Sequence, residues 1–171
     1  MAALALLVVA IALVGCGNTK VDGSASRSTA RSSITRAEFI RRVDAICEQI
    51  GRRFHAPPMR PEVVRDLRTR QVKPRDFADV ARYTGALIRA AAPEESRVES
   101  LDRPPGDALL RRWSIAEMRS SATAKNVHST ALSRDLAAFT RALEMNARAA
   151  EAYMRLSARA GFRACGRATG N

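Results

Sequence analysis

The chain has 171 residues and a formal net charge of +12, with 29 basic residues against 17 acidic ones. Three of the basic residues are lysine, which leaves 26 arginines. The length is that of one ordinary domain with its own core, and no internal repeat is evident. Alanine, leucine, arginine and glutamate dominate, and no convincing strand pattern is present. The composition therefore favours helices and argues against a sheet.

The chain opens on a continuous apolar run at 2–14. A helix that crosses a bilayer needs about 20 apolar residues, so this run is too short; it has the length of the apolar part of a signal peptide. No Lys or Arg precedes Lys20, although signal peptides usually begin with basic residues. Whether Met1 is the true start therefore stays open. The alternatives are an apolar terminus packed into a core and an uncleaved anchor.

The segment Leu13-Val14-Gly15-Cys16 resembles the bacterial lipobox, where a lipid is attached to the cysteine and the chain is cut just before it. The resemblance implies a lipoprotein signal peptide at 1–15, a lipidated Cys16 and a location on the extracytoplasmic face of the cell membrane. Residues 17–33 are rich in Ser, Thr, Gly and charge, and they cannot bury enough apolar surface to fold. We therefore expect a disordered tether over 16–33, which joins the anchor to a folded domain.

The remaining two cysteines are Cys47 and Cys165. Export places them in an oxidising compartment, where paired cysteines usually form a disulfide, so we predict that they are bonded. The alternative is two separate buried thiols in a cytosolic protein. A metal site is disfavoured because there is no CxxC pair, and because His55 and His128 stand at no ligand spacing from either cysteine.

The folded domain is expected over 34–167, with a disordered tail at 168–171. Thr35 and Glu38 fit a capping box that starts the first helix, and this helix should end near Phe54, ahead of two prolines. Its apolar residues recur at helical spacing and place Cys47 beside that face. A short second helix is expected over 61–70, because proline is favoured at the first helical position.

Three longer elements follow in chain order. One helix is expected over 75–101, with Pro93 kinking or interrupting it. The next should begin at Asp107, whose carboxylate favours a helix N-terminus, and the Ser/Thr-rich stretch 120–130 should break or fray it. The last helix is expected over 132–160, with Gly161 as its stop. Four amphipathic helices with short connections predict an all-α fold, an antiparallel up-down bundle of about four helices.

Three short patterns in the domain are shared with a known group of proteins. They are the spacing from Phe39 to Cys47, the junction Leu101-Asp102-Arg103-Pro104-Pro105, and the ending Gly161-Phe162-Arg163-Ala164-Cys165-Gly166. In these the chain resembles small, Ala-rich exported bacterial lipoproteins of unknown function, over about residues 35–166. The resemblance implies a tethered helical domain with one disulfide. It brings no catalytic residue with it.

The charge has a competing interpretation, because a pI near 11 is typical of nucleic-acid-binding proteins. A cytosolic basic protein that binds nucleic acid is therefore the main alternative function. Three observations argue against it. The basic residues are spread along the whole chain, aromatic residues form no stacking series, and heavy use of Arg and Ala also fits a genome rich in G and C. For an exported domain, the anions within reach would be lipid headgroups or wall polymers.

No catalytic constellation is found: neither a nucleophile-elbow motif nor a Gly-rich phosphate loop is present. His55 and His128 are expected in exposed, non-catalytic positions. Glu94 and Glu95 should serve a helix N-terminus after Pro93. We expect Glu48 and Glu117 to be surface charges, and Trp113, Met145 and Met154 to fill the core. The sequence thus predicts a non-enzymatic, membrane-anchored binding or envelope-associated module that needs no cofactor or metal; a small hydrolase or metal enzyme is the third hypothesis.

Overall fold

The computed structural model describes residues 34–166. The predicted signal peptide, the lipidated Cys16 and the tether fall on residues 1–33, outside the described part of the chain. The same is true of the predicted tail at 168–171.

Residues 34–166 form five α-helices and one 3₁₀ turn, and this part of the chain contains no strand. The elements are α1 (Arg36–Arg53), α2 (Pro61–Thr69), η2 (Pro74–Asp76), α3 (Phe77–Glu99), α4 (Ala108–Ser133) and α5 (Leu136–Ala160). The prediction of an all-helical fold is confirmed, and the helix packing fits a bundle. The predicted count of about four helices is not confirmed, because the short helix expected at 61–70 forms as α2 and brings the number to five.

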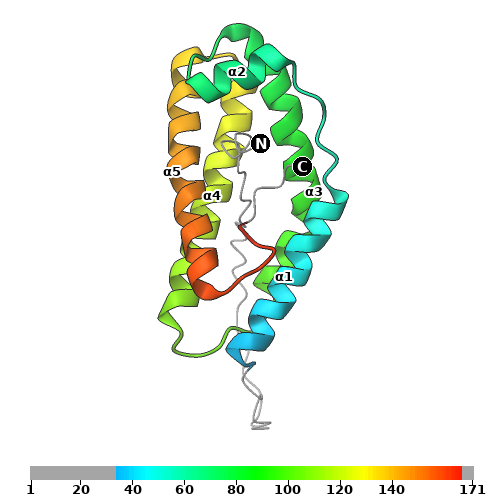
Figure 1. The fold of residues 1–171 in the computed structure, drawn as a ribbon, viewed down its shortest axis with the longest axis vertical. Helices are drawn as coiled ribbons and strands as arrows, with labels where there is room; N and C mark the ends of the chain where they lie inside the picture. Colours follow the sequence, from blue (N-terminus) through cyan, green and yellow to red (C-terminus); the bar gives the residue numbers. More distant parts are fainter. Residues whose placement is uncertain (1–33, 167–171) are drawn as a thin grey trace, which may run out of the picture.

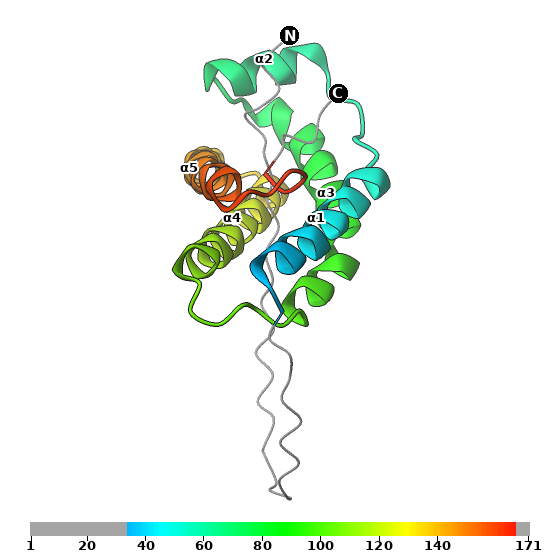
Figure 2. The ribbon, with the colours of Figure 1, turned by 60° about the horizontal axis from the view of Figure 1, so that its bottom comes forward.

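The four longer helices run along the long axis of the molecule, and α2 lies across one end of them (Figure 1). When the molecule is turned, α4 lies beside α5 and α1 lies beside α3 (Figure 2). The chain therefore folds as two adjacent helix pairs, and α3 packs against α4 where the pairs meet.

Side-chain caps set most helix starts. The Thr35 hydroxyl accepts a hydrogen bond from the amide of Glu38, and Pro61 opens α2, both as predicted. Asp107 accepts from the amides of Leu109 and Leu110 at the start of α4. Each cap satisfies amides that have no partner within the first turn of a helix. The stop predicted at Gly161 is confirmed, since this residue has a φ of 94°.

Two expected breaks are absent. Helix α3 continues through Pro93, and α4 continues through the Ser/Thr-rich stretch 120–130. In α4 the hydroxyls of Thr123 and Thr130 donate to carbonyls three and four residues earlier, so they are satisfied without leaving the helix. Ser120 and Ser121 are fully buried.

The last helix starts four residues later than predicted. Arg134 takes the left-handed conformation, with a φ of 57°, and ends α4. Asp135 then caps α5 by accepting from the amide of Ala138. Leu132, where the last helix was predicted to begin, consequently belongs to α4 and is 63% exposed.

The core has two main clusters. One surrounds Trp113, whose ring contacts Phe39 edge-on and Phe162 in a stacked arrangement at 4.4 Å. The other is centred on Phe77 and Phe139, which meet edge-on at 5.1 Å. The core position predicted for Trp113 is confirmed. Met145 is 55% exposed, so its predicted core role is wrong, and Met154 is half-buried.

Candidate functional site

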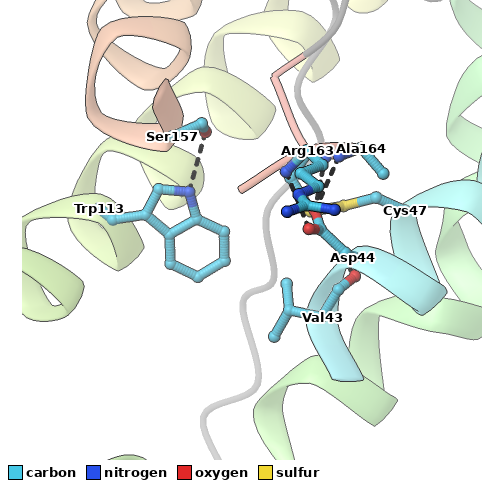
Figure 3. Close-up of a disulfide and its surroundings, with 8 residues drawn as sticks. Val43, Asp44, Cys47, Trp113, Ser157, Arg163 and Ala164 are labelled. Atoms are coloured by element: carbon cyan, nitrogen blue, oxygen red, sulfur yellow. Dashed lines mark hydrogen bonds between the residues drawn. A yellow bond between two sulfur atoms is a disulfide. The ribbon is translucent and has the colours of Figure 1, made fainter. Parts of the chain in front are cut away.

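The predicted disulfide between Cys47 and Cys165 is present and joins α1 to the segment that follows α5 (Figure 3). Its Cα atoms lie 5.3 Å apart and its residues are 118 positions apart in the sequence. Cys165 is buried, and Cys47 packs against the cluster around Trp113. The bond therefore links the two ends of the described chain through the core.

Asp44, one helical turn before Cys47, holds the C-terminal segment in place. Its carboxylate accepts hydrogen bonds from the amides of Arg163, Ala164 and Cys165, at 2.8, 2.9 and 3.1 Å (Figure 3). Three successive backbone amides therefore donate charge-assisted hydrogen bonds to one carboxylate. This role of Asp44 was not predicted from the sequence. An aspartate one turn before a cysteine and on its side of the helix was the available signal.

Two glutamates lie in positions other than those predicted. Glu94 is in the middle of α3 and is 1% exposed, where Arg53 and Arg97 both donate to its carboxylate. Glu95 pairs with Lys125 across the α3–α4 contact. Because α3 is continuous, neither glutamate serves a helix N-terminus. The predicted surface position of Glu48 is correct.

Glu117 is inside the bundle and is 9% exposed, so its predicted surface position is wrong. Burial and the neighbouring Glu95 raise the pKa of its carboxyl to about 8, and Arg103 only partly opposes this. Burial also raises the pKa of Glu95. The side chain of Glu117 consequently carries its proton at neutral pH.

His128 is half-buried and contacts α3. Its Nδ1 lies 3.0 Å from the Thr84 hydroxyl, whose own proton is donated to the Val80 carbonyl at 2.7 Å. With that proton committed, the hydroxyl oxygen accepts and Nδ1 donates. The pair therefore joins α3 to α4.

Gly85 allows this contact. A Cβ added at Gly85 would lie 3.0 Å from Cε1 of His128 and 3.4 Å from a terminal nitrogen of Arg89. At Gly51, in α1, an added Cβ would meet no atom within 4 Å.

These two glycines give a matched stability test. Gly51→Ala should stabilise the protein by about 0.8 kcal/mol, because alanine is the better helix former and nothing opposes it. Gly85→Ala should destabilise it by about 1 kcal/mol, because the crowding at His128 outweighs the same propensity gain. Urea unfolding followed by circular dichroism measures both. Equal stabilisation by the two changes would mean that His128 does not pack on Gly85.

A groove of about 690 Å³ lies between α3, the end of α4 and the segment after α1. Helix α3 supplies one face at helical spacing, α4 ends there with Leu132 and Arg134, and the segment after α1 adds exposed His55. The lining residues are His55, Pro57, Phe77, Ala78, Ala81, Arg82, Ala86, Arg89, Ala131, Leu132 and Arg134. The exposed position predicted for His55 is confirmed, but the groove was not foreseen, because it requires the packing of α3 on α4.

The charge of the groove is positive. Three arginines line it and no acidic residue does. Arg82 forms an ion pair with Asp79, and Arg60 pairs with the same carboxylate. Burial alone would raise the pKa of Asp79, but the two arginines outweigh burial and hold this pKa below its usual range. Arg89 and Arg134 have no acidic partner among residues 34–166. The end of α4 contributes only about half a negative charge, so the arginines outweigh it.

Comparison with protein-family models, curated proteins and solved structures finds no match to this chain. Within residues 34–166, no helix is long and apolar enough to cross a membrane. The function proposed below therefore depends on the sequence and on the arrangement of residues 34–166. Residues 34–166 form a disulfide-closed bundle, and an arginine-lined groove with apolar lining residues is open on its surface.

Proposed function

We propose that the protein is an exported lipoprotein, anchored through Cys16 to the extracytoplasmic face of the cell membrane, and that its helical domain is a non-catalytic binding module. The lipobox-like segment ending at Cys16 and the polar stretch 17–33 support the anchor and the tether. The arginine excess supports an affinity for anionic lipid headgroups or wall polymers near the membrane.

The disulfide between Cys47 and Cys165 is the observation that carries the proposal. Disulfides persist in oxidising compartments and are rare in the cytosol. The bond pairs the two cysteines other than Cys16, which leaves Cys16 as the third thiol. One unpaired cysteine after an apolar run is what lipid attachment needs.

The test is the mass of the N-terminal peptide from a membrane fraction of the native cell. The proposal expects a peptide that begins at Cys16 and carries diacylglyceryl and acyl groups. The matched control is a Cys16→Ser variant, which should lack the lipid mass and leave the membrane fraction. An unmodified peptide that begins at Met1 would overturn the proposal and make nucleic acid the leading partner.

A further inference from the structure

We propose that the groove between α3 and the end of α4 binds one molecule of an anionic amphiphile: a single-chain aliphatic carboxylate whose head contacts Arg89 and Arg134 and whose chain lies on the apolar floor. This inference names a ligand for the binding module and to that extent rests on the proposed function. It does not depend on the lipid anchor.

The head of the ligand is inferred from charge. Arg89 lies in α3 and Arg134 directly follows α4, and both line the groove without an acidic partner among residues 34–166. A guanidinium presents parallel N–H donors that match a carboxylate, and such charge-assisted pairs are the strong ones. Arg82 also lines the groove, but it pairs with Asp79, so the inferred head contacts are Arg89 and Arg134.

The body of the ligand is inferred from the floor. Between the arginines the lining is almost wholly apolar, with Phe77, Leu132 and four alanines. The alanines keep the floor low, and Leu132 is 63% exposed. Phe77, Ala81 and Ala131 are themselves buried, so a chain lying there would cover mainly the apolar surface of Leu132, Ala78 and Ala86. The volume of about 690 Å³ lies within the range of small-molecule sites.

The combination separates this ligand from other anions. A nucleic acid or a wall polymer presents repeated negative charges and binds best to a row of cations. Such a polymer would gain nothing from apolar residues between the arginines. Free phosphate would contact the arginines and leave the floor wet. A single charge joined to an aliphatic chain satisfies both parts of the groove.

The test is titration calorimetry of the purified, oxidised full chain with sodium octanoate. We expect one site per chain. Acetate, which has the head without the chain, and octylamine, which has the chain with the opposite charge, should bind at least about tenfold more weakly. The variant Arg89→Gln/Arg134→Gln should lose about tenfold or more in octanoate affinity. Leu132→Asn, at an exposed position, should weaken octanoate while leaving acetate unchanged.

The matched control is Arg141→Gln/Arg148→Gln. It removes the same charge from two exposed arginines of α5 that do not line the groove. It should bind octanoate like the unchanged protein. Equal losses of octanoate affinity in the two double variants would overturn the proposal and indicate general charge attraction. Absence of octanoate binding, or equal affinity for octanoate and acetate, would also overturn it. Because lipid mass at Cys16 is measured separately, failure of the anchor and failure of the groove are distinguishable.

Discussion

Replacing either partner of the disulfide should destabilise the protein strongly, and replacing both should cost no more. We expect Cys47→Ala and Cys165→Ala each to lower the free energy of unfolding by about 4 kcal/mol, because the bond closes a loop across 118 positions and restricts the unfolded chain. The double variant should match either single variant, since all three lack the same bond. Denaturant unfolding under oxidising conditions measures all three.

The position of the bond makes this effect global. Helix α1 packs mainly against α3. It is linked to the end of α5 and the segment after it by the disulfide, by the hydrogen bonds to Asp44, by a hydrogen bond from Arg36 to the Ala160 carbonyl, and by apolar packing in the cluster around Trp113. These contacts close the two helix pairs onto each other. Loss of the bond therefore weakens the contact between the two pairs and lowers the stability of the whole bundle.

The control uses a Cys16→Ser background, so that a freed thiol in either single variant cannot form a new disulfide with Cys16. Reduction of the parent protein should reproduce the loss seen in the variants. Losses that add in the double variant would contradict the prediction, because independent thiols contribute separately.

The features predicted correctly from the sequence are local. Caps at Thr35 and Asp107, and the stop at Gly161, depend on a few neighbouring residues that satisfy a helix end. The disulfide followed from the number of cysteines and the expected compartment. Short-range rules were sufficient for the helix ends because each capping residue lies within one turn of the amides that it satisfies. The disulfide was predictable because Cys47 and Cys165 were the two cysteines left once Cys16 was assigned to the lipid.

The errors arose where tertiary packing overrides local preference. Serine is a weak helix former, yet Ser120 and Ser121 are buried in α4, where small side chains allow close packing. The burial of Glu117 was detectable in principle, because it follows Trp113 by four residues and precedes Ser120 by three. A charged residue on that stripe was assigned to the surface on residue type alone.

The start of α5 and the groove show a different limit. Arg134 adopts a left-handed conformation without being glycine, so no residue type announced the turn. Asp135 just before Leu136 was the usable signal, as a cap. The groove combines Arg89 with Arg134, and their approach follows from how α3 packs on α4, which no spacing in the sequence specifies.

The burial of Glu117 predicts an inverted pH dependence of stability. Its carboxyl has a folded-state pKa of about 8, against an ordinary value of 4.5. Between these values the folded chain holds a proton that the unfolded chain has released. Stability contributed by this group is therefore greatest at low pH, falls as pH rises from about 5 to 8, and is constant above that. The raised pKa of Glu95 acts in the same direction.

Glu117→Gln isolates this effect, because glutamine keeps the shape and cannot ionise. The variant should match the parent at pH 5 and be more stable at pH 9 by on the order of 4 kcal/mol, since each pKa unit corresponds to about 1.4 kcal/mol. Urea midpoints measured across this range test it. Glu48→Gln, at an exposed site, should change stability by less than about 0.5 kcal/mol at any pH. Parallel pH profiles for Glu117→Gln and the parent would contradict the prediction. They would mean that Glu117 binds no proton in the folded state over this pH range, as in the unfolded state, and is therefore ionised at neutral pH.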